Sequence, residues 1–276
     1  MTIMQTIILG IVQGLSEFLP ISSSGHLIIV PFFFQWQIPK NEAFVFDVLV
    51  QVATLAAVFT YFWHDLVDIA FSMIEGLKHK TLYYNMQARL GWYIIVATIP
   101  AGIVGIAIKP IVEMTFGSPL VVGIGFIITS IFLTIAEKKG RQQRVIETMT
   151  LKDALWMGLL QALAILPGIS RSGSTIAAGV FNGLQRSAAA RFSFLMSVPV
   201  MIAAGALEIF DLFSIPNVNH ILLVFIPGFV IAALVGYLSI RWLLRFLIHR
   251  SLYPFSIYCF LMGVITIVTF LLMKTA

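Results

Sequence analysis

The chain has 276 residues, of which 59% are hydrophobic and only 11% are charged, and its formal net charge is +5 at pH 7. A soluble domain is about half apolar and about a quarter charged, so this composition indicates an integral membrane protein. The basic residues are spread over the connections between apolar segments, which argues against a nucleic-acid partner. The single cysteine, Cys259, lies inside an apolar segment, so the sequence excludes disulfides and cysteine-ligated zinc.

Eight apolar segments follow one another along the chain, and each is long enough for a helix that enters or crosses a bilayer. Four lie in the first half, at about 3–34, 44–63, 90–109 and 119–136. Four lie in the second half, at about 154–183, 190–208, 221–240 and 253–273. The more polar stretch 137–153 is expected to be a linker between two repeats, residues 1–136 and 154–276.

Two segments that lie 148 residues apart share an unusual pattern. Residues 10–26 read GIVQGLSEFLPISSSGH, and residues 158–174 read GLLQALAILPGISRSGS. Each passes from an apolar, helix-like stretch through glutamine and proline into a serine-rich turn that is closed by glycine. A duplicated, proline-broken segment inside apolar sequence predicts one site to which both halves contribute.

The distribution of basic residues predicts the topology. Lysine and arginine are concentrated in the connections after residues 63, 136 and 240, whereas the loops 35–43, 110–118 and 209–220 contain only Lys40. The positive-inside rule places the basic connections in the cytoplasm. Three apolar segments then separate the second basic connection from the third. If each of them crossed the membrane once, the two connections would lie on opposite sides, although both are basic. The conflict disappears if 154–183, broken by proline and glycine, enters the membrane and returns to the same side.

By the same argument, 3–34 is a re-entrant hairpin that enters from the outside. The sequence therefore predicts an all-α polytopic membrane protein built from two inverted-topology repeats, each a re-entrant helical hairpin plus three transmembrane helices. An odd number of spans in each half inverts the second half relative to the first. The two hairpin tips would then face each other near the midplane, where broken helices are tolerated because they line a polar cavity.

The first hairpin carries oxygen ligands. Gln13 and Glu17 are four residues apart, so their side chains lie on one helix face. A carboxylate inside a membrane segment is costly and usually serves a function. A carboxylate, an amide oxygen and water suit a hard cation such as Mg²⁺ or Ca²⁺. Alternatively, Gln13 only hydrogen-bonds to a neighbouring helix.

The tip of this hairpin combines hydroxyl groups with an imidazole, in the run Ser22, Ser23, Ser24, Gly25 and His26. A helix that begins near the histidine would direct free N–H groups at an anion. The hydroxyls offer a nucleophile and the imidazole a proton carrier. The simpler alternative is a serine N-cap beside an interfacial histidine, but the nearby carboxylate in a re-entrant segment favours a functional site.

The tip of the second hairpin adds a fixed positive charge at Arg171, flanked by Ser170, Ser172, Gly173 and Thr175. A guanidinium with converging O–H and N–H donors can bind a phosphate in a bidentate manner. The alternative is an arginine that extends to the membrane surface, which the flanking glycines and the position within the hairpin argue against. Together the two tips predict a site for a diphosphate and a metal ion, since phosphoryl transfer depends on positioning and charge neutralisation.

The strings QGLSEFLPISSSGH and LPGISRSGST resemble the two signature motifs of the bacterial undecaprenyl-diphosphate phosphatase (bacitracin-resistance) family. The likeness covers essentially the whole chain. It implies hydrolysis of undecaprenyl diphosphate to undecaprenyl phosphate and inorganic phosphate, which recycles the lipid carrier for cell-wall synthesis, and tolerance of bacitracin. It also implies a divalent cation, a multi-pass location in the bacterial plasma membrane, and access to the site from the extracytoplasmic side. Many members have a second glutamate where this chain has Gln13, which leaves a metal one fewer negative ligand.

The resemblance also implies roles for the residues in the two motifs. Glu17 would bind the metal with help from Gln13, and Arg171 would clamp the diphosphate. Ser22, Ser24, Gly25, Ser170, Ser172, Gly173 and Thr175 would bind substrate. Ser23 and His26 would perform or assist the attack on phosphorus, and the choice between a phospho-enzyme and attack by water stays open.

A transporter of phosphorylated polyprenyl lipid is the main rival, because inverted repeats with broken helices are typical of transporters. A structural membrane subunit is a third reading, but it would need neither Glu17 nor Arg171. The motifs favour the enzyme, with membrane lipids and the polyprenyl diphosphate as its partners, and they leave a homo-oligomer open.

Overall fold

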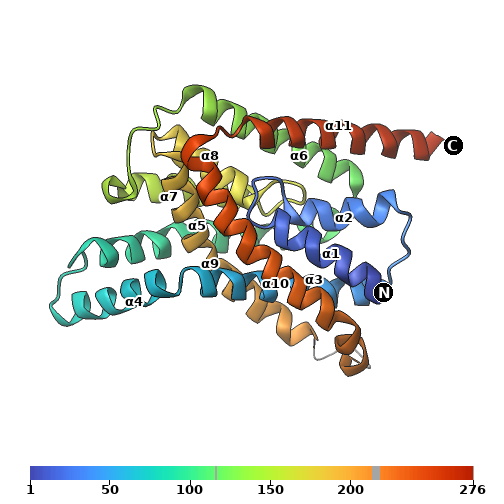
Figure 1. Cartoon of the computed structure of the whole chain (residues 1–276), viewed down its shortest axis with the longest axis horizontal. Helices are drawn as coiled ribbons and strands as arrows, with labels where there is room; N and C mark the ends of the chain where they lie inside the picture. Colours follow the sequence, from blue (N-terminus) through green and yellow to red (C-terminus); the bar gives the residue numbers. More distant parts are fainter. Residues whose placement is uncertain (116, 213–217, 276) are drawn as a thin grey trace.

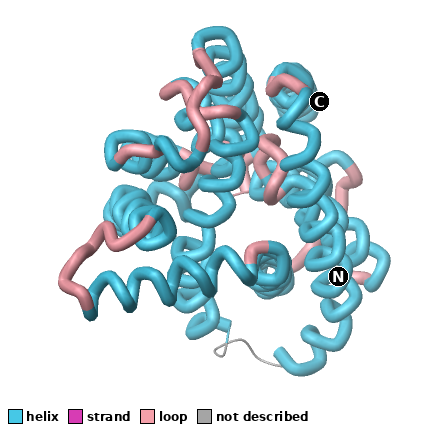
Figure 2. The backbone as a smooth tube through the Cα atoms, turned by 60° about the vertical axis from the view of Figure 1, so that its left-hand side comes forward, coloured by secondary structure: helices cyan, strands magenta, loops and turns pink. Residues whose placement is uncertain are grey.

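The computed structural model describes residues 1–115, 117–212 and 218–275. Every regular element of two or more turns in these ranges is an α-helix, with loops between them and no strand (Figure 2). The six helices of the first half are α1 (Ile3–Ser16), α2 (Ser23–Phe33), α3 (Lys40–Tyr61), α4 (Trp63–Lys78), α5 (Met86–Thr115) and α6 (Pro119–Lys139). After a short 3₁₀ turn at Ile146–Thr148, the second half contains α7 (Leu151–Leu163), α8 (Arg171–Phe181), α9 (Arg186–Leu212), α10 (Val218–His249) and α11 (Tyr253–Thr275).

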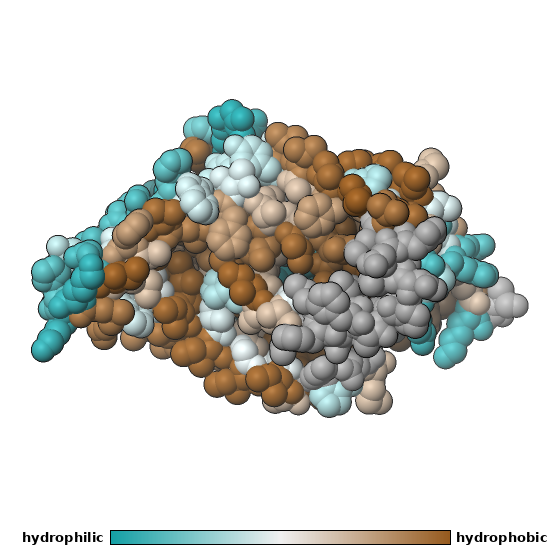
Figure 3. Space-filling view, turned by 90° about the horizontal axis from the view of Figure 1, so that it is seen from below, coloured by the Kyte–Doolittle hydropathy of each residue, from teal (hydrophilic) through white to brown (hydrophobic). Residues whose placement is uncertain are grey.

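Six helices of the described chain are long and apolar enough to cross a membrane, namely α3, α5, α6, α9, α10 and α11. Brown, hydrophobic atoms dominate the middle of the face in Figure 3, and teal, hydrophilic atoms gather toward its ends. The expectation of an all-α, multi-pass membrane protein is thereby confirmed. The shorter helices α1 and α2 occupy the predicted hairpin 3–34, and α7 and α8 occupy the predicted hairpin 154–183.

Two of the differences from the expected elements have identifiable reasons. Helix α4 was expected to be part of a connection, because its exposed apolar residues, such as Phe71 and Ile74, are interrupted by charged ones and form no continuous apolar run. Helix α10 continues to His249 instead of ending near 240, because Leu243 and Leu247 extend its buried stripe by one more helical turn each. The expected loop 209–220 includes residues 213–217, which lie outside the described ranges.

Each hairpin rests against a long helix of the other half. Helix α1 packs on α10, and α7 packs on α5. The contacts are between backbones: a Cβ atom at Gly10 would lie 2.4 Å from the Gly228 carbonyl oxygen, and one at Gly158 would lie 2.4 Å from the Ala97 carbonyl oxygen. Only glycine permits this approach at either position. Small residues at such crossings are typical of helix packing in membranes.

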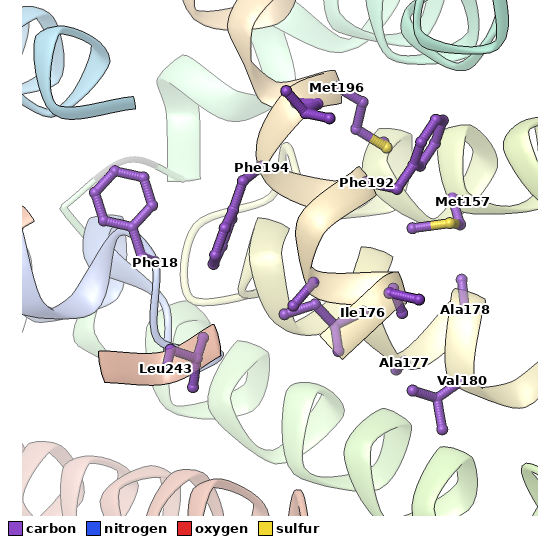
Figure 4. Packing of buried hydrophobic residues seen from close by; sticks show 14 of the residues in the cluster. Phe18, Met157, Ile176, Ala177, Ala178, Val180, Phe192, Phe194, Met196 and Leu243 are labelled. Carbon is purple, nitrogen blue, oxygen red and sulfur yellow. The ribbon is translucent and has the colours of Figure 1, made fainter. Parts of the chain in front are cut away.

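The first hairpin tip is held in the core by an aromatic anchor. Phe18, directly after Glu17, is fully buried and meets Phe194 of α9 edge-to-face, with ring centroids 5.5 Å apart (Figure 4). Edge-to-face pairs contribute about 0.5–1.5 kcal/mol beyond the burial of their surface. The carboxylate next to this ring therefore projects from a fixed point.

The start of the second hairpin is fixed by an ion pair with the linker. Arg144 donates to both oxygens of the Asp153 carboxylate, at 3.1 and 2.6 Å, and Thr150 donates to it as the N-cap of α7. Burial tends to raise the pKa of Asp153, but the hydrogen bonds from Arg144 and Thr150 outweigh it and hold this pKa below its usual value. The carboxylate is therefore ionised at neutral pH, and α7 starts at a defined place on the linker.

Candidate active site

The two hairpin tips meet through their charged residues. Arg171 Nη2 donates to Glu17 Oε1 at 2.5 Å, across 154 residues of sequence. The Glu17 side chain is 9% exposed and that of Arg171 is 16% exposed, so the pair is largely shielded from solvent. Breaking one partner of such a pair leaves an uncompensated charge in a medium of low dielectric constant. The acidic and basic motifs therefore form one site.

Glu17 is the centre of the first tip. Helix α1 ends at Ser16, and the amide of Glu17 still donates to the Gln13 carbonyl at 2.9 Å, which keeps both side chains on one face. Gln13 Nε2 donates to Glu17 Oε2 at 3.0 Å, and Ser23 Oγ donates to the same oxygen at 2.5 Å. One carboxylate oxygen thus faces the arginine, while the other receives an amide and a hydroxyl.

The three consecutive serines have different surroundings. Ser22 is the N-cap of α2, with φ at 71°, and its Oγ accepts from the Gly25 amide at 3.3 Å. Positive φ at a residue other than glycine costs about 1 kcal/mol or more, and such strain is found at functional sites. Ser24 is exposed and lies 3.4 Å from Ser22, oxygen to oxygen. Only Ser23 contacts the carboxylate.

His26 is held in a defined orientation by groups from two elements. Its Nδ1 lies 2.7 Å from the Ser22 carbonyl oxygen, and its Nε2 lies 2.7 Å from the Tyr258 hydroxyl of α11. A carbonyl oxygen only accepts, so Nδ1 carries a hydrogen, and in the neutral ring Nε2 accepts from the tyrosine. The ring also packs edge-to-face against Phe126 of α6. In this structure His26 supports the strained turn at Ser22, and Ser23 hydrogen-bonds to Glu17.

The second tip has the same N-cap hydrogen bond as the first, although the φ of its N-cap serine is negative. Ser170 is the N-cap of α8, and its Oγ accepts from the Gly173 amide at 3.0 Å. The Ser170 amide donates to Thr129 Oγ1 of α6 at 2.9 Å, which ties the tip to a long helix. Ser172 Oγ donates to the Leu19 carbonyl at 3.0 Å and so joins the two tips.

Thr175 lies one turn further along α8 and is fully buried. Its hydroxyl donates to the Arg171 carbonyl at 2.9 Å and lies 2.6 Å from Ser193 Oγ of α9. The structure therefore uses Thr175 and Ser172 to position Arg171 and the tip. Neither hydroxyl is directed at the Glu17–Arg171 pair.

Two buried polar atoms beside this pair have no partner among the described residues: Arg171 Nη1 and Gln13 Oε1. A buried donor or acceptor that is left unpaired costs about 1–3 kcal/mol, so such atoms call for a ligand. The guanidinium nitrogen suits an anionic oxygen, and the amide oxygen suits a cation or a water molecule. Helices α2 and α8 both begin at this point, so two helix N-termini add positive potential for an anion.

The donor set for a metal ion consists of oxygens from Glu17 and Gln13. In the part of the chain that the structure describes, no three His, Cys, Asp or Glu residues come together as a ready-made metal cluster. The Glu17 charge is also balanced by Arg171. The residues fit a hard cation only if an anionic ligand supplies further oxygens.

The contacts of Tyr258 and Thr129 with the hairpin tips could not be predicted from the sequence. Both lie inside apolar spans, far along the chain from either motif, and nothing in their local pattern connects them to the tips. Their roles depend on where α11 and α6 pack. Only the fold reveals them.

The fold and the site define a multi-pass membrane protein in which two hairpin tips bring a buried carboxylate and a buried guanidinium together. The chain matches the family described as "Bacitracin resistance protein BacA" over residues 6–265, and it belongs to this family.

Curated relatives bear the name "Undecaprenyl-diphosphatase". The relative from Moorella thermoacetica is 41% identical, over 99% of this chain and 100% of its own. The relative from Methanosphaera stadtmanae is 42% identical over 96% and 97%, and that from Myxococcus xanthus is 38% identical over 97% and 89%. The family suggested by the two motifs is thereby confirmed.

Proposed function

We propose that this protein hydrolyses undecaprenyl diphosphate to undecaprenyl phosphate and inorganic phosphate, and so confers tolerance of bacitracin. Membership of the family and the names of its relatives support the substrate. The observation that carries the site assignment is the Glu17–Arg171 contact, with one guanidinium nitrogen left for an anionic oxygen. The site residues are therefore Glu17, Ser23 and Arg171, supported by Gln13 and His26.

The contacts suggest an order of events. The diphosphate draws Arg171 away from Glu17, because phosphate oxygens accept bidentate hydrogen bonds from a guanidinium. Glu17 then keeps only its hydrogen bonds from Gln13 and Ser23 among those that the structure shows. Ser23, already 2.5 Å from Glu17, gives its proton to the carboxylate as its oxygen attacks the terminal phosphorus. The bond from this phosphorus to the bridging oxygen breaks, and undecaprenyl phosphate leaves.

A water molecule then hydrolyses the phosphoserine, with Glu17 exchanging the proton, and releases inorganic phosphate. Attack by water in a single step is the competing route. Rapid quenching of a reaction with labelled terminal phosphate should trap label on Ser23. Absence of label in a reaction that turns over would favour the single step.

Purified protein in detergent micelles should release inorganic phosphate from undecaprenyl diphosphate over many turnovers. Micelles have no second side, so a transporter of the phosphorylated lipid would release none under these conditions. Active, folded protein that releases no phosphate would therefore refute the proposal in favour of its rival.

We propose that a divalent cation, Mg²⁺ or Ca²⁺, binds together with the substrate. Glu17 and Gln13 would hold it, with the unpaired amide oxygen of Gln13 as a neutral ligand. When bound, the cation would neutralise charge on the diphosphate.

Removal of divalent cations is expected to abolish phosphate release, and added Mg²⁺ or Ca²⁺ should restore it. The same cations should leave the thermal midpoint of the substrate-free protein unchanged, because Arg171 already balances Glu17. Full activity in excess chelator, or a cation-dependent rise in the midpoint without substrate, would contradict this.

Tyr258→Phe removes the hydroxyl that donates to His26 Nε2 and keeps the ring in place. We expect kcat to fall about 10-fold with little change in KM, a typical size for the loss of a positioning contact. Tyr253→Phe, at the exposed start of α11, is the matched control. An unchanged kcat for Tyr258→Phe would remove this tyrosine from the site.

We further propose that the two halves are inverted repeats, with the site reached from the extracytoplasmic side of the plasma membrane. The reciprocal packing of α1 on α10 and of α7 on α5, and the matching N-caps at Ser22 and Ser170, support the repeat. Both termini lie at the right of Figure 1, away from the basic turn between α4 and α5. An apolar groove of about 490 Å³ at the amino-terminal end, lined by residues such as Leu27 and Pro31, would take the prenyl tail.

Cysteines placed at Asn41 and Ser118, in a Cys259→Ala background, are expected to react with an impermeant thiol reagent in intact cells. A cysteine at Arg141, in the basic linker, should be protected until the membrane is opened. Protection of both Asn41 and Ser118 variants would overturn the orientation.

A further inference from the structure

A second polar site lies at the end of α10, apart from the hairpin tips. It is an open groove of about 790 Å³ lined by Leu238, Arg241, Trp242, Arg245, Phe246, His249 and Arg250. None of these residues belongs to either motif. The groove therefore needs its own explanation.

The lining residues form one face of a helix. Leu238, Arg241, Arg245 and His249 recur at intervals of three and four, and Trp242 lies four residues after Leu238, so they share one face of α10. Trp242 stacks on Phe246, with ring centroids 4.8 Å apart, and both rings pack against Phe255 of α11. The groove is thus lined both by packed aromatic rings and by a row of cationic side chains.

The cationic side chains lack acidic partners. Within the described ranges, no carboxylate forms an ion pair with Arg241, Arg245 or Arg250, all of which are exposed. The neighbouring carboxylate, Glu137, is already occupied by Arg186 and by the Leu252 amide. Three guanidinium groups that face the same opening make a strongly positive, unneutralised patch.

The length of α10 indicates that the groove lies at the depth of lipid headgroups. The apolar part of α10 runs from Leu223 to His249, which is 27 residues. At 1.5 Å per residue it is about 40 Å long, whereas the hydrocarbon core is about 30 Å thick. The last turns therefore emerge into the interface, where tryptophan and arginine are the expected anchors. Leu238 and Trp242 line the groove and are exposed, so they can contact the acyl chains of a lipid.

We propose that this groove binds the headgroup of an anionic membrane phospholipid. The arginines contact the phosphate oxygens, and the Leu238–Trp242 surface contacts the first part of the acyl chains. Arginine binds phosphate through paired N–H donors, and basic pockets at this depth select anionic headgroups. A neutral lipid would leave three adjacent positive charges unbalanced.

The test is the thermal midpoint of the full-length protein in uncharged detergent micelles, followed by tryptophan fluorescence. Phosphatidylglycerol added at saturation is expected to raise the midpoint by about 5 °C, the size that a ligand at about 100 times its Kd produces in a protein of this length. Phosphatidylcholine at the same mole fraction should leave it unchanged. Inorganic phosphate at the matched concentration should also have no effect.

The variant Arg241→Gln/Arg245→Gln should lose at least four-fifths of the shift. The control Lys138→Gln/Lys139→Gln removes two exposed charges outside the groove and should keep the shift. An equal shift in both variants, no shift in the wild type, or an equal shift with inorganic phosphate would overturn the proposal. If the double variant shows no thermal transition, the single variant Arg245→Gln is tested in its place. Loss of the midpoint shift in this variant is expected, and a retained shift would refute the site.

Discussion

Phosphate release from undecaprenyl diphosphate is expected to fall about 10³-fold when Arg171 is replaced by lysine. A lysine can keep the ion pair with Glu17, but it offers a single charged nitrogen where the structure shows two, Nη2 on the carboxylate and the unpaired Nη1. Loss of one preorganised donor to developing charge costs about 10²–10³-fold in kcat. The same substitution also removes the planar, bidentate fit to phosphate.

The matched control is Arg191→Lys. Arg191 forms an exposed ion pair with Asp65 at the membrane edge, and its side chain is 46% exposed, so the substitution should leave both activity and stability unchanged. Activity of Arg171→Lys within about 3-fold of the wild type would show that a point charge suffices. The assigned bidentate contact would then be wrong.

Glu17→Gln is expected to lower kcat by about 10³-fold, within the range for loss of a general base. Glutamine has the shape of glutamate, but its single oxygen can replace only one of the two that accept from Ser23 and Arg171, and it cannot take a proton. The change also leaves Arg171 buried without a counter-charge, so a lower thermal midpoint is expected as well. Both the rate of phosphate release and the thermal midpoint of the variant should therefore be measured.

Two further variants separate the chemical effect from the loss of stability. Glu75→Gln removes an exposed carboxylate paired only with its helical neighbours and should change neither quantity. Arg171→Gln combined with Glu17→Gln removes both charges and should recover part of the midpoint without recovering activity. Recovery of activity in the double variant would mean that Glu17 acts only as the partner of Arg171.

Much of this architecture could be predicted because helical period and polarity are local properties. The break at 17–22 contains Pro20 and that at 164–170 contains Pro167 and Gly168, and the spans follow from their length. The convergence of Glu17 and Arg171 was expected from the duplicated pattern, which implies two tips at one place.

The finer geometry could not be predicted, because it depends on which helices pack together. Ser23, and not His26, contacts the carboxylate, since Tyr258 and the Ser22 carbonyl hold the imidazole. Ser172 and Thr175 were expected among the substrate donors, yet here their hydroxyls bond to Leu19 and Ser193. A sequence shows which groups are present near a turn, but not which neighbour competes for each of them.

The contact of Gly10 with Gly228 has a consequence for biosynthesis. The surface on which α1 packs belongs to α10. The amino-terminal hairpin therefore lacks its packing partner until the second half of the chain has entered the bilayer. Until then its serines and its carboxylate must be kept out of contact with lipid. Water or the insertion machinery can provide this polar environment. Truncated chains that end before α10 should consequently be degraded by membrane proteases and should not accumulate.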